Sequence, residues 1–154
     1  MATAYSATRA ECSKVKGDLA SMIRAKASAM RSRRASSVGI SRLAGTSARD
    51  VQADRLASAR QLAERFQCIV VLKGSGTVIA APGQPCAINS SGNALLATAG
   101  TGDVLAGMLG AGLAGGLEAF EAACGAVFAH GRIADEWPAR RGGRALTASA
   151  LASS

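Results

Sequence analysis

The hydrophobic and polar positions of residues 48–66 repeat with the period of an α-helix. The apolar positions recur every three or four residues and are Leu56, Ala59, Leu62, Ala63 and Phe66. The charged positions lie between them, and we assign to the solvent side Asp54, Arg55, Arg60 and Glu64. Ser47, with Asp50 three residues later, is typical of a helix N-terminus. The pattern therefore predicts an amphipathic helix that begins after Ser47.

Short apolar runs follow this helix, and each of them ends at a turn. Residues 68–72 are continuously apolar, which is typical of a strand buried on both faces of a mainly parallel sheet. Residues 77–80 and 86–88 predict two further strands, with a Pro82-Gly83 turn between them. We therefore expect three strands in this part of the chain.

An uncharged run at residues 104–117 predicts a buried helix that starts at Thr101 or Gly102. It is dense in glycine, at Gly107, Gly110, Gly112, Gly115 and Gly116. Each glycine inside a helix costs up to about 1 kcal/mol relative to alanine, so we expect another backbone to pack close to this helix. A second helix over residues 117–134 carries His130, which we expect to be a structural hydrogen-bonding residue. Residues 138–154 are expected to form a flexible tail.

Candidate chemistry begins at the start of the uncharged run, at Gly100, Thr101, Gly102 and Asp103. Glycines let the backbone approach a ligand closely, and the first N–H groups of a helix form a site for an anion such as phosphate. Asp103 in the first turn would lie beside that phosphate, where it can accept a proton from an attacking hydroxyl. A plain glycine turn followed by an aspartate that the helix dipole favours explains the same residues equally well.

Two further segments carry polar residues in short turns. The turn between the first two strands consists of Lys73, Gly74, Ser75, Gly76 and Thr77. A lysine, two glycines and two hydroxyls at such a turn are able to hold the phosphates or ribose of a nucleotide. The segment after the third strand reads Asn89, Ser90, Ser91, Gly92 and Asn93.

Together these segments resemble the ADP-dependent (S)-NAD(P)H-hydrate dehydratases of the ribokinase-like superfamily. The C-terminal half of that family carries a Lys-Gly-x-Gly-Thr turn, then Asn-x-Ser/Thr-Gly-Asn, then Ala-Thr-x-Gly-Ser/Thr-Gly-Asp-Val-Leu. This chain has all three in the same order, at residues 73–77, 89–93 and 97–105. The resemblance runs from about residue 43 to residue 135.

The resemblance implies an α/β, ribokinase-like three-layer fold of which residues 39–137 form only the C-terminal half, with central parallel-type strands. It implies a metabolite repair enzyme that dehydrates hydrated NADH and NADPH, consuming ADP with Mg²⁺ and releasing AMP and phosphate. Asp103 would be the catalytic base, and no protein ligand to a metal is expected. The residues implied to bind the nucleotide are Lys73, Gly74, Ser75, Gly76, Thr77, Asn89, Asn93, Gly100, Thr101 and Gly102.

The chain also departs from the family. The family carries a Thr-Pro-His-Pro-like segment whose histidine contacts substrate, and residues 35–40 have no histidine in its place. Ala94-Leu95 replaces the more usual Pro-Gly. Three hypotheses follow: a competent dehydratase, a non-catalytic fragment that at most binds adenine nucleotide, or another ribokinase-like small-molecule kinase. An incomplete sheet with a free edge would also favour self-association into a homo-oligomer.

Composition and charge narrow the class of protein. The 154 residues are 49% hydrophobic and 3% aromatic, enough for one modest domain. Residues 1–42 hold nine lysines and arginines and two acidic residues, so most of the +8 net charge lies there. We therefore expect no nucleic-acid partner and interpret residues 1–38 as a basic, disordered or non-native extension, with a transit peptide or a basic arm as alternatives.

The cysteines and the lengths of the apolar runs bear on location. Four cysteines lack the spacing of a metal site or a disulfide framework, which is typical of a reducing cytosol. No apolar run reaches the length of a membrane span. We expect a cytoplasmic protein with no membrane partner.

Overall fold

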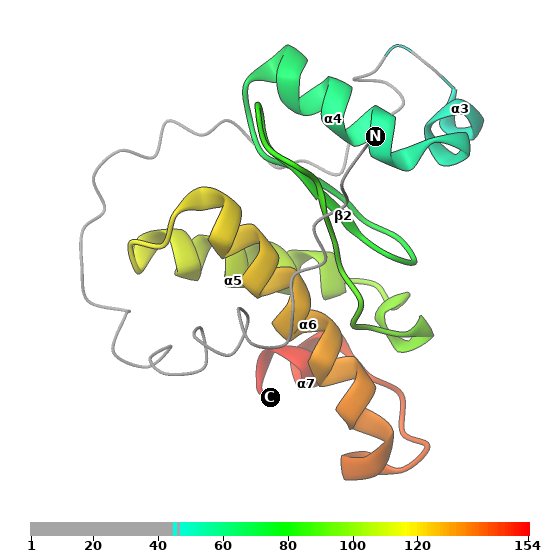
Figure 1. Ribbon diagram of the computed structural model, residues 1–154. Helices are drawn as coiled ribbons and strands as arrows, with labels where there is room; N and C mark the ends of the chain where they lie inside the picture. The colour runs from blue at the N-terminus through cyan, green and yellow to red at the C-terminus, as the bar shows by residue number, and fades with distance from the viewer. Residues whose placement is uncertain (1–44, 46) are drawn as a thin grey trace.

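The computed structural model describes Gly45 and residues 47–154 (Figure 1). Helices α3 (Ala48–Ala53) and α4 (Arg55–Phe66) precede strands β1 (Val70–Leu72), β2 (Val78–Ala80) and β3 (Ala87–Ile88). After the 3₁₀ turn η3 (Ala94–Leu96) come α5 (Thr101–Ala114), α6 (Ala119–Arg141) and α7 (Ala148–Ala152). The predictions for residues 1–38 lie outside the described residues.

The predicted first helix is divided in two at Asp54. Its beginning is confirmed, because Ser47 and Asp50 form a capping box with bonds of 3.1 and 3.2 Å. The backbone of Asp54 then leaves the helical region, and its carboxylate accepts the Ala57 N–H at 2.9 Å to start α4. An aspartate that periodicity assigns to the solvent side therefore acts as a helix cap, a position that its short polar side chain favours.

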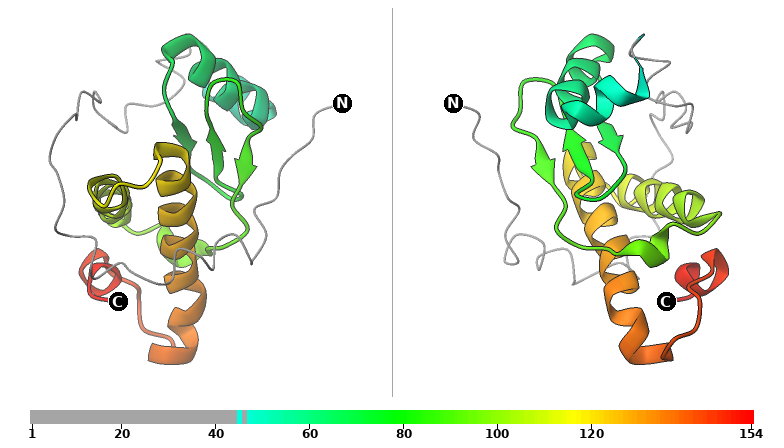
Figure 2. Two further views of the ribbon diagram at one scale, coloured as in Figure 1. Left: turned by 60° about the vertical axis from the view of Figure 1, so that its left-hand side comes forward. Right: turned by 90° about the vertical axis from the view of Figure 1, so that its right-hand side faces the viewer.

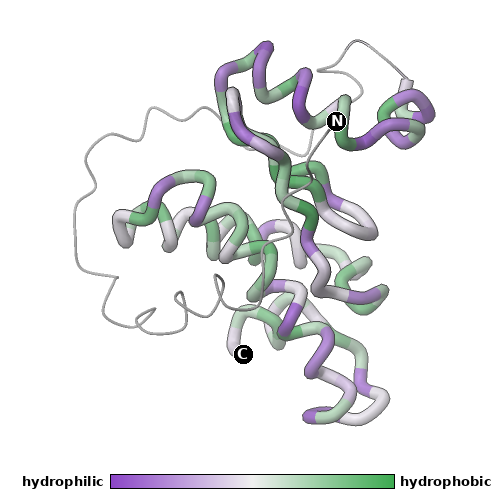
Figure 3. The backbone as a smooth tube through the Cα atoms, viewed as in Figure 1, coloured by the Kyte–Doolittle hydropathy of each residue, from purple (hydrophilic) through white to green (hydrophobic). Residues whose placement is uncertain are grey.

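Helix α4 alternates between hydrophilic and hydrophobic positions along its turns (Figure 3). Ala59, Leu62 and Ala63 are buried as predicted. Leu56 and Phe66, predicted on the same apolar face, are 37% and 46% exposed. They lie at the two ends of a 12-residue helix that packs mainly on β1 and β2, so the narrow sheet does not cover them.

The three strands form a sheet in the order β1-β2-β3, and both pairings are antiparallel. The prediction of parallel-type strands is therefore wrong for these three. The reason is the short connections, since a parallel pair needs a crossover of a dozen or more residues. All of β2 is buried, whereas Val70 and Val71 of β1 are only partly buried, so β1 is not the doubly covered strand that its apolar run predicts.

The elements stack in three layers, as Figure 2 shows. On one face of the sheet, Leu72 and Val78 pack with Ala59 and Ala63 of α4. On the other face, Ile79 and Ala87 pack with helices α5 and α6, through Leu105, Ala123, Ala126 and Val127. The predicted helix break at residues 115–116 is confirmed, with α5 ending at Ala114.

The C-terminal residues form helix rather than the flexible tail that the sequence predicts. Helix α6 continues past residue 134 to Arg141, with Trp137 buried and its Nε1–H donating to Arg144 O at 2.8 Å. Leu146 and Leu151 are 1% and 2% exposed and pack with Ala134 and Trp137. These apolar residues are widely spaced among Ala and Ser, which explains why they give a weak pattern. Among residues 47–154, no helix has both the length and the apolar character to cross a bilayer.

Candidate nucleotide-binding site

The N-terminus of α5 is formed by the predicted glycine turn. Gly100 is the N-cap residue and has φ +85°, a left-handed conformation that favours glycine. A Cβ atom there would also lie 2.9 Å from the Cβ of Ala148 in α7. The turn before α5 therefore depends on a glycine at this position and on the C-terminal helix behind it.

The sequence predicts that the first N–H groups of α5 are free to bind an anion, but most of them donate hydrogen bonds within the protein. The Asp103 and Val104 N–H groups donate to Gly100 O at 3.0 and 3.2 Å, and the Thr101 N–H donates to Thr98 O at 3.4 Å. Within the described residues, this leaves the Gly102 N–H without a protein acceptor. The candidate anion site therefore has fewer free N–H groups than the sequence predicts, and the free one belongs to Gly102.

Lys73 comes from a distant part of the sequence to the same place. It is exposed, directly after β1, and a Cβ built on Gly102 would lie 2.5 Å from its Nζ. The ammonium group therefore rests against the backbone of Gly102. Two positive groups, the ammonium and the helix N-terminus, repel each other unless an anion lies between them, so this arrangement favours a phosphate.

Asp103 is exposed in the first turn of α5, next to Gly102. In the part of the chain that the structure describes, its carboxylate has no hydrogen bond or ion pair. Such a carboxylate is available to accept a proton from a molecule bound at Gly102. The same placement also suits an aspartate that only stabilises the helix start, so position alone does not separate the two hypotheses.

Thr101 and His130 hold the turn from behind. Thr101 is buried, and its hydroxyl lies 2.8 Å from both Leu96 O and Thr98 O, so its side chain does not face a ligand. The buried His130 ring lies with Nε2 2.8 Å from Thr101 O. Burial lowers the pKa of His130, the hydrogen bond to Thr101 opposes this, and the charge of Lys73 lowers it further. The predicted structural role of His130 is confirmed.

The turn of residues 73–77 is held by Arg55 of α4. Gly74 and Gly76 have φ of +148° and +61°, and the Thr77 hydroxyl donates to Gly74 O at 3.1 Å. The Arg55 guanidinium donates through Nη2 to Leu72 O at 2.9 Å and through Nη1 to Ser75 O. Arg55 is therefore half-buried and not on the solvent side, where periodicity assigns it.

The loop of residues 89–93 uses its asparagine side chains on itself and on α6. Asn89 Nδ2 donates to Ser91 O at 2.8 Å. Asn93 Oδ1 accepts the Leu95 N–H at 3.0 Å and caps η3. Both residues are predicted to bind nucleotide, yet in this structure both side chains hold the loop.

Helix α6 supplies the partners that anchor this loop. Asp135 accepts the Gly92 N–H at 2.9 Å and an Asn93 Nδ2 bond at 3.2 Å. Asn93 Nδ2 also donates to Ala134 O at 2.8 Å. Pro138 lies four residues after Ala134 and has no N–H, so this carbonyl lacks its usual helical donor. The sequence pattern does not predict these partners, although a proline inside a helix leaves the carbonyl four residues earlier without its helical donor.

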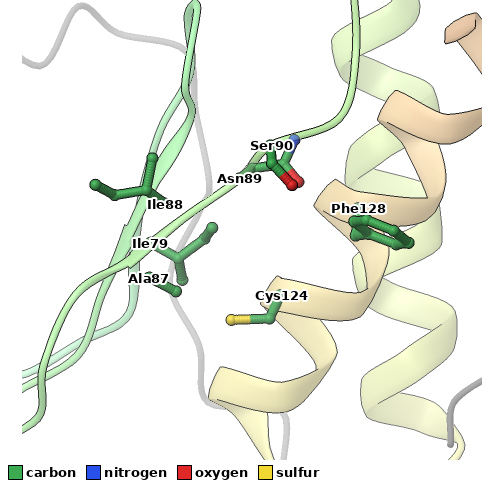
Figure 4. A pocket seen from close by; sticks show the side chains of 7 residues that line it. All are labelled: Ile79, Ala87, Ile88, Asn89, Ser90, Cys124 and Phe128. Atoms are coloured by element: carbon green, nitrogen blue, oxygen red, sulfur yellow. The ribbon is translucent and has the colours of Figure 1, made fainter. Parts of the chain in front are cut away.

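The site is an open surface within the described residues. A hollow of ≈ 20 Å³ lies between the sheet and α6, where Cys124 points toward Ile79 and Ala87 (Figure 4). It has room for about one water molecule and not for a nucleotide. A second hollow, of ≈ 280 Å³, lies along α3 and α4 beside Asp50 and Asp54. Neither is lined by Lys73, Gly102 or Asp103.

Comparison with known proteins identifies the family. A profile described as NAD(P)H-hydrate dehydratase matches residues 37–154. The chain is 51% identical over 94 residues to the ADP-dependent (S)-NAD(P)H-hydrate dehydratase of Neisseria meningitidis, covering 61% of this chain and 32% of that protein. It is 44% identical over 110 residues to the bifunctional NAD(P)H-hydrate repair enzyme Nnr of Escherichia coli, covering 71% of this chain and 21% of that protein.

Solved structures agree with the sequence comparison. The ADP/ATP-dependent NAD(P)H-hydrate dehydratase of Bacillus subtilis, co-crystallised with ATP and Mg²⁺, superimposes with a TM-score of 0.69 at 35% identity. The match covers 73% of this chain and 41% of that one. The chain thus spans about a third, or less, of the length of the curated relatives named here. On the profile match and these likenesses, the chain belongs to the NAD(P)H-hydrate dehydratase family.

Proposed function

We propose that this chain supplies the nucleotide-binding and proton-accepting part of an ADP-dependent dehydratase of (S)-NAD(P)H hydrates. One observation carries the proposal: the Lys73 ammonium rests on Gly102 at the start of α5, with the exposed Asp103 beside it. A cation, a free amide and a carboxylate in one place suit a phosphoryl group that is attacked by a hydroxyl. The names of the relatives in Neisseria and Bacillus support this reaction.

Each residue has a defined task in this proposal. Lys73 and the Gly102 N–H bind the terminal phosphate of ADP, and the exposed Ser75 and Gly76 lie where the turn meets the rest of the nucleotide. Asp103 accepts the proton of the hydroxyl on the hydrated nicotinamide ring. The hydroxyl oxygen then takes the terminal phosphoryl group, and AMP leaves. Loss of phosphate together with a ring proton restores the double bond of the dihydronicotinamide.

The residues present fit a magnesium ion that is held mainly by the nucleotide. No group of three or more His, Cys, Asp or Glu side chains capable of holding a metal occurs in residues 47–154. Mg²⁺ commonly keeps several waters and binds to the phosphates of a substrate, so it needs no cluster of protein ligands here, and Asp103 stays free to accept a proton. The ion would neutralise the charge of the phosphates while Lys73 and Gly102 orient them.

A second candidate function is adenine-nucleotide binding without turnover. The open surface around Lys73 and Asp103 favours it, because catalysis also needs a wall that excludes water and holds the nicotinamide. A ribokinase-like small-molecule kinase is the third alternative, and the family match favours a dehydratase over it. For either of the first two functions we propose a cytoplasmic location, in keeping with cysteines that lack the spacing of a disulfide framework. We also propose self-association, since β1 and β3 each have only one neighbour in the described sheet.

The test combines a binding and an activity measurement on the unmutated chain. Calorimetric titration with ADP and Mg²⁺ should release heat, and Lys73→Ala should weaken binding about tenfold, the effect of losing one charged hydrogen bond. Hydrated NADH is then incubated with ADP, and recovery of NADH absorbance is followed. Recovery supports the dehydratase, and binding without recovery supports the second candidate. Absence of binding at millimolar ADP contradicts both.

A further inference from the structure

We propose that Arg55 is a positioning residue that fixes the Lys73 ammonium over Gly102 and thereby sets the affinity of the turn for a nucleoside diphosphate. The affinity part of this statement rests on the proposed function. The positioning part concerns only the protein. Arg55 lies on α4, outside the three motifs at residues 73–77, 89–93 and 97–105.

The two carbonyl groups that accept hydrogen bonds from Arg55 belong to residues on either side of Lys73 in the sequence. Leu72 O, the acceptor of Nη2 at 2.9 Å, precedes it, and Ser75 O, the acceptor of Nη1, follows it by two residues. The guanidinium therefore joins the end of β1 to the far side of the turn. This fixes the backbone from which the Lys73 side chain projects, and a fixed backbone sets the direction of a long, exposed side chain.

Because Gly74 has no side chain, the Arg55 guanidinium can lie directly against its backbone. A Cβ built on Gly74 would lie 2.9 Å from Arg55 Nη2 and 3.2 Å from Cζ. Its φ of +148° also belongs to a region that other residues rarely adopt. A glycine at this point is conformationally free, and Arg55 adds an external contact to the Thr77–Gly74 hydrogen bond within the turn.

The chemistry of the contact requires arginine. Its planar guanidinium presents several N–H donors at fixed spacing and can serve two carbonyls at once, whereas a lysine ammonium acts as a point charge on a flexible stem. Arg55 has no carboxylate partner in the described residues, where both ion pairs lie on α6. Its Nε is buried without an acceptor, so in this structure the side chain serves the two carbonyls and not a salt bridge.

The first experiment compares ADP affinity in matched variants. Arg55→Met removes the donors, Arg55→Lys keeps only the charge, and Arg60→Met is the control on the exposed side of the same helix. We expect both Arg55 variants to bind ADP with Mg²⁺ about tenfold more weakly, as Lys73→Ala does, and Arg60→Met to bind within about twofold of the unmutated chain. Full affinity in Arg55→Lys would overturn the proposal, because charge alone would then suffice.

A double-mutant cycle separates positioning from general damage to the fold. Arg55→Met added to Lys73→Ala should weaken binding little further, since the ammonium that Arg55 orients is already gone. A merely structural effect would weaken binding by the same factor in both backgrounds and would lower the melting temperature in parallel. Equal factors in the two backgrounds would therefore contradict the proposal.

The second experiment needs no ligand and distinguishes failure of this proposal from failure of the proposed function. The sequence has one histidine, so the imidazole signal of His130 can be titrated by proton NMR without ambiguity. The charge of Lys73 lowers the pKa of His130, so Lys73→Ala should raise it. Arg55→Met should shift the pKa in the same direction, with no added shift in the double variant. An unchanged pKa in either single variant would overturn the placement of Lys73 by Arg55.

Discussion

Helices α5 and α6 are neighbours, and both are rich in alanine and glycine, yet they are buried to very different extents. Helix α6 buries nine of its 23 residues, including Gly125 and Gly131, whereas α5 buries only Thr101, Leu105 and Gly112. Asp103 is the single charged residue of α5. A helix that is apolar on all sides is normally buried on all sides. The outer face of α5 is therefore short of a partner within the described residues.

The glycines show the same difference. A Cβ on Gly131 of α6 would lie 2.7 Å from Ser91 C and 2.8 Å from Gly92 N. On α5, Gly112 lies close to Ala122 of α6, but Gly107 and Gly110 have nothing within 4 Å. The prediction that a backbone packs close to the glycine-rich helix is thus confirmed at one position only. We infer that α6 mainly supports the fold, whereas α5 carries the candidate site residues Gly102 and Asp103 at its exposed N-terminus.

The largest expected effect is at the exposed start of α5. Asp103→Asn keeps the size of the side chain but removes the proton acceptor, so ADP-dependent turnover of hydrated NADH should fall about 10² to 10⁴-fold. ADP affinity should hold or rise, because a negative charge beside the phosphate is lost. Stability should change by at most about 1 kcal/mol, the helix-dipole contribution. Turnover equal to that of the unmutated chain would show that Asp103 only supports the helix.

A glycine pair tests the contrast between the helices directly. Gly131→Ala should destabilise the fold by about 1–3 kcal/mol, because backbone atoms of residues 91 and 92 must move. The matched change Gly107→Ala on α5 meets open space and should stabilise by up to about 1 kcal/mol through helix propensity. Urea unfolding of the three proteins measures both values. Similar destabilisation by both changes would mean that the face of α5 is covered in solution.

The exposed face of α5 also predicts self-association. Leu113, 37% exposed, lies on this face with Ala106 and Ala114. Leu113→Ser should lower the sedimentation-derived fraction of oligomer and cost less than about 1 kcal/mol of stability, since the residue is only partly buried. The control is Leu105→Ser, a buried position on the same helix, which should instead unfold the chain at lower urea. If the fraction of oligomer is the same in Leu113→Ser, the contact does not involve this face of α5, and the edges of the sheet become the next candidates.

The sequence predicts what depends on local pattern, and it misses what depends on distant partners. The capping box at Ser47, the start of α5 at Thr101 and the break after Ala114 all follow from short-range signals, and all are confirmed. The role of Arg55 is invisible in a periodic pattern, because its acceptors lie 17 and 20 residues away. The same is true of Asp135, whose partners precede it by more than 40 residues.

The predicted site residues divide in the same way. Residue type and spacing predict Lys73, Gly102 and Asp103 as site residues, and the fold brings the first two close together. Thr101, Asn89 and Asn93 share the motifs, but their side chains are used inside the protein. Motif spacing predicts which segments bind a ligand, whereas the direction of each side chain depends on hydrogen bonds that only the folded chain provides.

The smallest expected effect is a pH dependence of the free energy of unfolding that comes from His130 of α6. Burial lowers the pKa of His130 below its usual 6.5, so the unfolded chain takes up a proton at a higher pH than the folded chain does. Stability should therefore be full above pH 6.5 and fall as the pH drops from there toward the folded-state pKa, because protonation favours the unfolded state. His130→Gln keeps a donor toward Thr101 O and cannot titrate, so it should lose this part of the pH dependence. The measurement is urea unfolding of both proteins across that interval, and parallel curves would mean that carboxylates, not His130, cause the decline.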